Sequence, residues 1–188
     1  MKYNKEKLCD GIEKVNKLIE ENPMPTWDQL PALELYMDQV IILLNQYLKI
    51  FAIGSEENKF ITPPMINNYV KLKIMPAPIK KKYGKIHLAY LIVICSLKQT
   101  LSMSTIQKII PIDLCENEIR KIYETFVKNQ KKVLKSTNSQ IKTVAQLISE
   151  NSDENSQSIY ELVIENAISS NLTKLLTEKL ADMQENDD

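Results

Sequence analysis

Few side chains in this sequence could do covalent chemistry. His87 is the one histidine in the chain, and a single imidazole with no cysteine near it in sequence cannot form a metal cluster. We expect it on the surface or in the first turn of a helix. Cys9, Cys95 and Cys115 stand far apart and form no CxxC pair; Cys95 lies in an apolar run that predicts a core residue. Because no nucleophile-elbow, zinc-protease, Walker or dinucleotide-binding pattern occurs, we expect no enzyme, no catalytic residue, no metal site and no cofactor.

Lysine side chains are concentrated in the middle of the chain. The whole sequence has 24 basic and 24 acidic residues, but residues 58–112 hold nine lysines and no aspartate or glutamate. Residues 1–57 have a net charge of −4 and residues 113–188 a net charge of −5. A surface that faces phosphates must lack carboxylates, because each one would repel the DNA backbone. The distribution favours nucleic-acid binding by the central segment; the alternative is a chance bias in a solvated surface.

Two short stretches of this segment carry the residues that we expect to contact DNA. Asn67, Asn68 and Lys71 lie within about one helical turn, and asparagine can bind adenine through two hydrogen bonds in the major groove. Lysines on a nearby turn can bind phosphates without reading the base sequence. For the asparagines, the alternative role is local capping. The hydroxyls of Tyr69 and Tyr83 could donate to phosphate; the alternative is that both rings pack in the core. The full candidate set for DNA binding is Thr62, Asn67, Asn68, Tyr69, Lys71, Lys73, Lys80, Lys81, Lys82, Tyr83 and Lys85.

The elements that must position these residues are mostly helices. The chain has only three glycines, which is too few for a sheet with many tight turns, so we expect an all-α, mainly helical protein. Thr26 to Gln29 has the pattern of a capping box, and the prolines and glycine of residues 77–84 predict a turn or a short β-ribbon. Apolar spacing and capping residues predict helices over residues 3–21, 32–51, 63–73, 86–97, 102–110, 116–134, 141–148 and 159–183.

Two of the expected helices have informative apolar patterns. The helix over 86–97 is apolar on nearly every side, which predicts a buried central position; it is too short to span a bilayer. The N-terminus lacks a secretory pattern, so we expect a cytoplasmic protein that does not enter a membrane. The helix over 159–183 would be about 38 Å long. Its apolar stripe predicts pairing with a second copy of the chain; the alternative is that it folds back onto its own chain.

The order of parts after residue 60 resembles the MerR-type winged helix-turn-helix. Asn67 stands where that family has arginine, and Lys73 stands where it has glycine. The resemblance implies a winged helix-turn-helix domain with a small β wing at residues 58–112. An N-terminal helical extension at 1–57 and a C-terminal helical region at 113–188, for dimerisation or an effector, would flank it. The residues at matching positions are Ile66 and Tyr69 of the recognition helix, Ile74 to Pro76 at its exit, Lys82 and Tyr83 of the wing, Leu91, Ile94 and Leu97 of the core helix, and Leu101 to Ile106 beyond it.

The sequence is more similar to an uncharacterised bacterial family, domain of unknown function 1836. The similarity covers roughly residues 25–115, is carried by Trp27-Asp28 and residues 35–40, 62–71 and 81–83, and implies no activity. We therefore expect a non-enzymatic, DNA-binding transcriptional regulator that forms a homodimer through its C-terminal helix, with any effector unidentified. The alternative is a protein–protein interaction module of winged-helix shape, whose basic surface binds an acidic partner or the chain's own acidic flanks.

Overall fold

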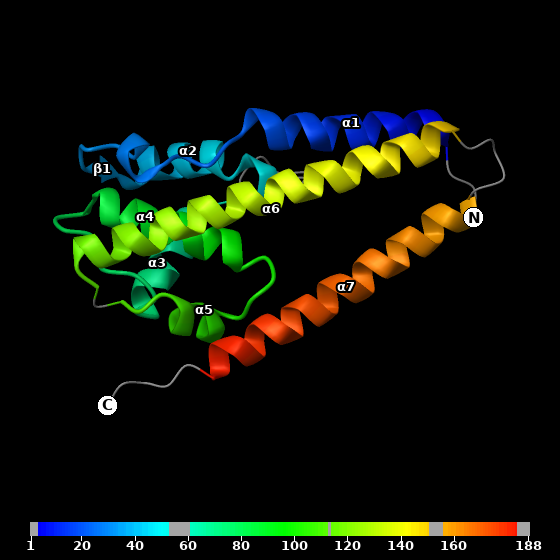
Figure 1. Cartoon of the computed structure of the whole chain (residues 1–188). Coiled ribbons are helices and arrows are strands. Elements are labelled where there is room, and N and C mark those ends of the chain that lie inside the picture. Colours follow the sequence, from blue (N-terminus) through cyan, green and yellow to red (C-terminus); the bar gives the residue numbers. More distant parts are fainter. Residues whose placement is uncertain (1–3, 53–60, 113, 151–155, 184–188) are drawn as a thin grey trace.

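The computed structural model describes residues 4–52, 61–112, 114–150 and 156–183. Helices dominate this part of the chain and a two-stranded sheet is its only regular β-structure, so the expected mainly helical fold is confirmed (Figure 1). The elements are α1 (Lys5–Glu21), a 3₁₀ turn (Trp27–Gln29), β1 (Leu35–Tyr36), α2 (Met37–Tyr47), a second 3₁₀ turn (Lys49–Ala52), α3 (Pro63–Lys71), β2 (Lys82–Tyr83), α4 (Lys85–Leu97), α5 (Met103–Ile109), α6 (Glu116–Glu150) and α7 (Ser156–Asp182).

Helix α4 is the centre of the hydrophobic core. Every residue from His87 to Ser96 is buried, as its apolar pattern predicted, and α2 and α6 pack against it. The core cluster extends from Met24 to Tyr123. It therefore crosses the boundaries expected near residues 57 and 112, because side chains from all three segments bury their apolar surface together. Each described helix is too short or too polar to cross a bilayer.

The segment between α1 and α2 is anchored to α6. Gln29 accepts a hydrogen bond from the Thr26 N–H at 2.8 Å, so the reciprocal part of the expected capping box is present. Trp27 is buried and packs edge-on against Tyr123 with ring centroids 6.0 Å apart. The Tyr123 hydroxyl donates to the Pro25 carbonyl at 2.8 Å. The resulting contact joins segments that are nearly a hundred residues apart in the sequence.

The helix expected over residues 32–51 is shorter than predicted. Its first residues are extended instead, and Leu35 and Tyr36 pair with Tyr83 and Lys82 in antiparallel register. Helix α2 begins only at Met37, and residues 49–52 form a 3₁₀ turn. The apolar spacing was correct for α2, but a strand partner almost fifty residues later determines the conformation of its N-terminal flank. Local spacing carries no signal for such a pairing.

Helix α6 is continuous, whereas the apolar spacing predicted two helices separated by residues 135–140. This polar stretch contains neither glycine nor proline, so nothing in it stops a helix. Contacts with α1 support it: the Asn138 amide donates to Glu20 at 3.1 Å, and the Lys142 ammonium lies 3.9 Å from the same carboxylate. Figure 1 shows α1 running beside the second half of α6.

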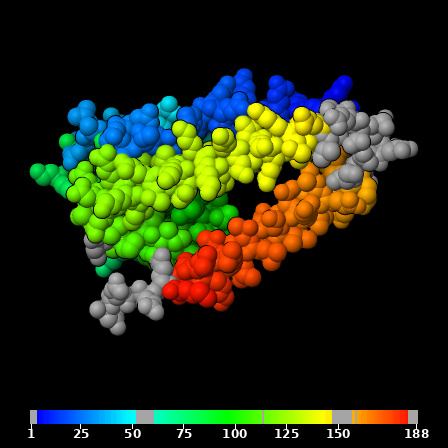
Figure 2. Space-filling model, viewed as in Figure 1, coloured from blue at the N-terminus to red at the C-terminus, as the bar shows by residue number. Residues whose placement is uncertain are grey.

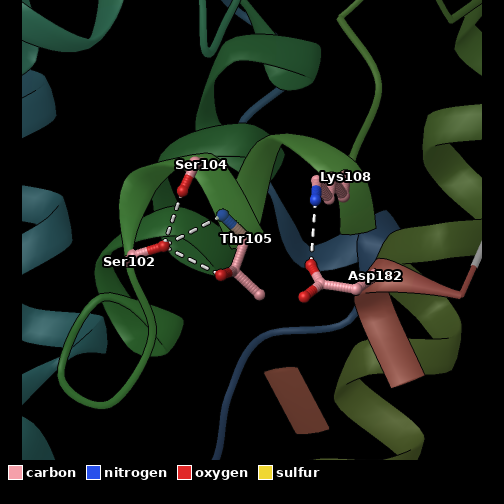
Figure 3. Close-up of polar contacts among 5 residues, drawn as sticks. All are labelled: Ser102, Ser104, Thr105, Lys108 and Asp182. Atoms are coloured by element: carbon pink, nitrogen blue, oxygen red, sulfur yellow. Dashed lines mark hydrogen bonds and ion pairs between the residues drawn. The ribbon is translucent and has the colours of Figure 1, made fainter. Parts of the chain in front are cut away.

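Helices α5 and α7 meet at the C-terminal end of α7. Ser102 is the N-cap of α5 and accepts from the Thr105 N–H at 3.1 Å (Figure 3). At the other end of α5, the Lys108 ammonium lies 2.9 Å from the Asp182 carboxylate. The expected C-terminal helix is confirmed as α7, but it packs on its own chain mainly through α5. A polar loop is expected at 151–156 and a frayed tail at 184–188; apart from Ser156, which begins α7, these residues lie outside the described part of the chain.

Candidate nucleic-acid interface

Helix α3 presents a polar face to solvent. Ile66 and Tyr69 are buried, whereas Asn67, Asn68 and Lys71 are exposed. Among the described residues, neither asparagine amide makes a side-chain hydrogen bond, so the local capping role has no support. Thr62 is the N-cap residue, but its side chain makes no capping bond. The two amides and the ammonium can therefore contact a ligand without giving up an existing bond.

The C-terminal end of α3 carries a lysine in the left-handed region. Lys73 has φ 54°. Its N–H donates to the Val70 carbonyl at 3.0 Å, and the Ile74 N–H donates to the Tyr69 carbonyl at 3.0 Å. These two bonds form a Schellman motif, in which glycine is the usual left-handed residue. Here the motif holds an exposed lysine just beyond the helix.

Lys80 and Lys81 form the tip of a two-residue hairpin turn. Ile79 and Lys82 exchange two backbone hydrogen bonds, of 3.1 and 2.9 Å. Lys80 has φ 48° and Lys81 has φ 63°, as required of the central pair in a type I′ turn, where asparagine and glycine are strongly preferred. Both lysines are exposed. The turn predicted for residues 77–84 is thus confirmed, and it lies at the end of the molecule that also carries β1 (Figure 1).

Lys82 and Lys85 bind to the N-terminal segment instead of pointing freely into solvent. The Lys82 ammonium lies 3.9 Å from the Glu34 carboxylate and 5.6 Å from the centre of the Tyr36 ring. Lys85 lies 5.6 Å from the centre of the Trp27 ring. These contacts fasten the hairpin to the preceding segment. The sequence predicted that both lysines would be free to bind phosphate. In the structure each one contacts a side chain of the N-terminal segment instead.

Tyr69 and Tyr83 are core residues, with 4% and 3% of their surface exposed. The expectation that they present hydroxyls to phosphate is wrong, and the packing alternative is correct. Burial raises the pKa of Tyr69 far above its ordinary value, and a hydrogen bond with the buried Cys95 adds to the shift. Burial also raises the pKa of Tyr83. Both rings hold α3 and the hairpin against α4.

His87 lies in the first turn of α4, which was one of the two positions expected from the sequence. It is buried and not on the surface. Its Nδ1 accepts from the Gly84 N–H at 3.0 Å, and its Nε2 lies 3.1 Å from the Ala77 carbonyl, which can only accept. In these two contacts Nδ1 is the acceptor and Nε2 is the donor. His87 joins the two ends of the segment that carries the turn. Composition alone gave no signal for this role.

Four exposed lysines of the acid-free segment have no acidic partner among the described residues. Within the part of the chain that the structure describes, no carboxylate lies within ion-pairing distance of Lys71, Lys73, Lys80 or Lys81. The Gln107 amide of α5 donates to the Leu72 carbonyl at 3.2 Å, which places α5 beside the end of α3. The exposed set is thus two amides and two lysines of α3 and its exit, and two lysines of the hairpin turn. Such groups can bind phosphates and base edges.

The described residues offer no alternative centre for metal chemistry. No three histidine, cysteine, aspartate or glutamate side chains among them are grouped so that they could hold a metal ion. Cys95 is buried, and burial raises the pKa of its thiol to about 11. A thiol in that state is a poor nucleophile near neutral pH.

The model of a protein family matches this chain. It describes a domain of unknown function, DUF1836, and it covers residues 25–126. The chain belongs to the DUF1836 family. The matched residues nearly coincide with the hydrophobic core, which extends from Met24 to Tyr123, so the family domain contains α2 to α5 and the first part of α6. No curated protein and no solved structure matches the chain significantly.

Proposed function

We propose that this DUF1836 protein binds double-stranded DNA as a non-enzymatic transcriptional regulator. The observation that supports this function is the exposed set formed by Asn67, Asn68, Lys71 and Lys73 with the turn lysines Lys80 and Lys81. All six come from a segment without a carboxylate. A surface of amides and unpaired ammonium groups has the composition of a phosphate-binding and base-contacting face.

In this proposal α3 lies in the major groove. Asn67 and Asn68 bind base edges, for which adenine is the best match to an amide. Lys71 and Lys73, at the C-terminal end of the helix, bind backbone phosphates. The turn of Lys80 and Lys81 acts as the wing and binds phosphates beside the groove. The order of helix, turn and core helix resembles the MerR type, and the resemblance supports this docking mode.

The backbone conformation of the lysines also supports a binding role. Lys73, Lys80 and Lys81 are the only residues other than glycine with positive φ in the described part of the chain. A left-handed conformation costs about 1 kcal/mol for a residue with a Cβ atom, and glycine or asparagine would avoid much of this cost. Strain of this kind is typically retained where a side chain is needed for function.

The first test is duplex binding as a function of salt concentration. If the four unpaired lysines each neutralise one phosphate, the logarithm of the binding constant should fall with log[salt] with a slope of about −3.6 per chain. Fluorescence anisotropy with a mixed-sequence duplex, from 50 to 200 mM salt, measures this slope. Absence of duplex binding at the lowest salt concentration would count against the function.

Variants distinguish the proposed surface from charge in general. Replacing Lys80 and Lys81 by glutamine should weaken duplex binding at least tenfold and reduce the salt slope by about two. The control is Lys131→Gln with Lys132→Gln, which removes the same charge from exposed positions of α6. Equal losses in the two variants would show that net charge, and not the turn, determines binding.

A protein–protein interaction module is the second candidate. Two contacts favour it: Glu34 and Asp182, from the acidic flanks, pair with Lys82 and Lys108 of the basic segment. In this function the remaining lysines would bind an acidic protein. Stable copurification with such a protein, together with no affinity for duplex DNA at low salt, would favour it over the regulator.

A further inference from the structure

Helix α7 carries a row of exposed apolar side chains spaced by four residues. Each of the six is between 42% and 62% exposed. Apolar patches of this length on soluble proteins mark interaction sites. We call these residues the α7 row: Tyr160, Ile164, Ile168, Leu172, Leu176 and Leu180.

The middle of the α7 row faces away from the rest of the chain. Ala181 is buried where α7 meets α5, and at about 100° per residue Leu172 lies half a turn round the helix from it. Figure 2 shows an open gap between α6 and the middle of α7, so α6 does not cover this part of the helix. The fold-back alternative accordingly leaves the row exposed.

The row is symmetric about residue 170. In an antiparallel pair of α7 helices centred there, Tyr160 lies opposite Leu180, Ile164 opposite Leu176, and Ile168 opposite Leu172. The same register places Glu161 opposite Lys179. A parallel pair would instead put like charges together at each of these positions, which is unfavourable. Both the apolar pattern and the charges therefore fit a second copy in antiparallel orientation.

We propose that the α7 row binds the same row of a second copy of this chain, in an antiparallel crossing centred near residues 168–172. The contact is isologous, so one two-fold axis generates both halves and closes the dimer. This inference specifies the surface and the orientation of the homodimer that the sequence predicted. It does not depend on DNA binding, because the oligomeric state is measured without DNA.

The first experiment measures the oligomeric state of the full chain by sedimentation equilibrium across a range of concentrations. The parent chain should be a dimer, and Ile168→Glu with Leu172→Glu should be a monomer at the same concentrations. Both positions are exposed, so circular dichroism should show an unchanged fold. Val133→Glu is the matched control: Val133 is an exposed apolar residue of α6, outside the row, and the variant should stay dimeric. A monomeric parent, or a dimer that survives both charges, would overturn the proposal.

The second experiment determines the orientation. In a background with Cys9 and Cys115 replaced by serine, Ile164→Cys and Leu176→Cys are prepared as separate proteins and treated with a short bifunctional maleimide. A mixture of the two should form cross-linked dimers, whereas each protein alone should form few. Efficient cross-linking of each protein alone indicates a parallel pair and overturns the proposal, as does a mixture that does not cross-link.

Discussion

Three lysine residues have a left-handed backbone conformation, which is unfavourable for any residue other than glycine. Lys80 and Lys81 form a turn for which asparagine and glycine are the preferred residues, and Lys73 occupies a helix terminus where glycine is usual. At all three positions the side chain is an exposed cation. A residue of this type makes the local fold less stable, so its presence is better explained by what the side chain binds than by packing.

Replacing Lys80 and Lys81 by asparagine and glycine should therefore separate stability from binding. The free energy of unfolding should rise by about 1 kcal/mol, because the left-handed turn loses its strain, while affinity for duplex DNA falls. Urea unfolding, with the midpoint compared at constant m value, measures the first effect. Lys71→Asn is the control, since Lys71 lies in α3 with helical backbone, and it should give no stabilisation. A destabilised Asn-Gly variant would refute the strain argument.

At the scale of elements, long-range contacts determine where helices begin and how far they run. Helix α6 continues through a polar stretch because α1 lies beside it and Glu20 contacts its side chains. The segment before α2 is extended because Leu35 and Tyr36 pair with β2. Tyr123 joins α6 to the N-terminal segment through one buried hydrogen bond. These contacts join the N-terminal segment to α6 and to the hairpin strand.

The Tyr123→Phe variant tests the anchor between α6 and the N-terminal segment. It removes the donor to the Pro25 carbonyl and leaves that buried acceptor without its partner, which should lower the free energy of unfolding by about 1–3 kcal/mol. Thermal or urea unfolding gives the value. Tyr36→Phe is the matched control, because Tyr36 is more than half exposed and its hydroxyl can bond to water in either state. Equal effects of the two substitutions would contradict an anchoring role for Tyr123.

At the scale of the whole molecule, the hydrophobic core contains buried ionisable groups from α3, α4 and α6. Burial raises the pKa of the Cys95 thiol to about 11, and it also raises the pKa values of Tyr69 and Tyr123. Each group is neutral in the folded state and loses its proton more easily after unfolding. Alkaline conditions should therefore favour the unfolded chain.

The stability of the protein should decrease as pH rises above about 9. The unfolded chain releases the Cys95 proton near the ordinary thiol pKa of 9.0, whereas the folded chain retains it to about 11. Stability is thus full below pH 9 and is lost progressively toward pH 11, with about 2–3 kcal/mol from this one thiol. Urea midpoints at pH 8, 9, 10 and 11 should fall, and should fall less in Cys95→Ala. Cys115→Ala is the control, because Cys115 is exposed. Identical pH profiles of the two variants would exclude a contribution from Cys95.

The sequence alone determined the helical class, the family and the core position of α4. Each of these depends on local signals, such as the spacing of apolar residues and the positions of capping residues and prolines. It also located the acid-free segment, because charge is counted without knowing the fold. The extent of helices α3, α4 and α5 followed to within a few residues for the same reason.

Only the tertiary structure decided which residues of that segment are available to a ligand. Tyr69 and Tyr83 enter the core, and Lys82 and Lys85 contact the N-terminal segment, while Lys80 and Lys81 pair with no carboxylate of the described residues. Whether a side chain is buried, paired or exposed depends on groups that approach from distant parts of the chain. Glu34 and Trp27 lie some fifty residues before the lysines that they contact, and no local pattern records their approach. The physical reason is that pairing and burial are properties of the packed molecule, whereas spacing is a property of the chain.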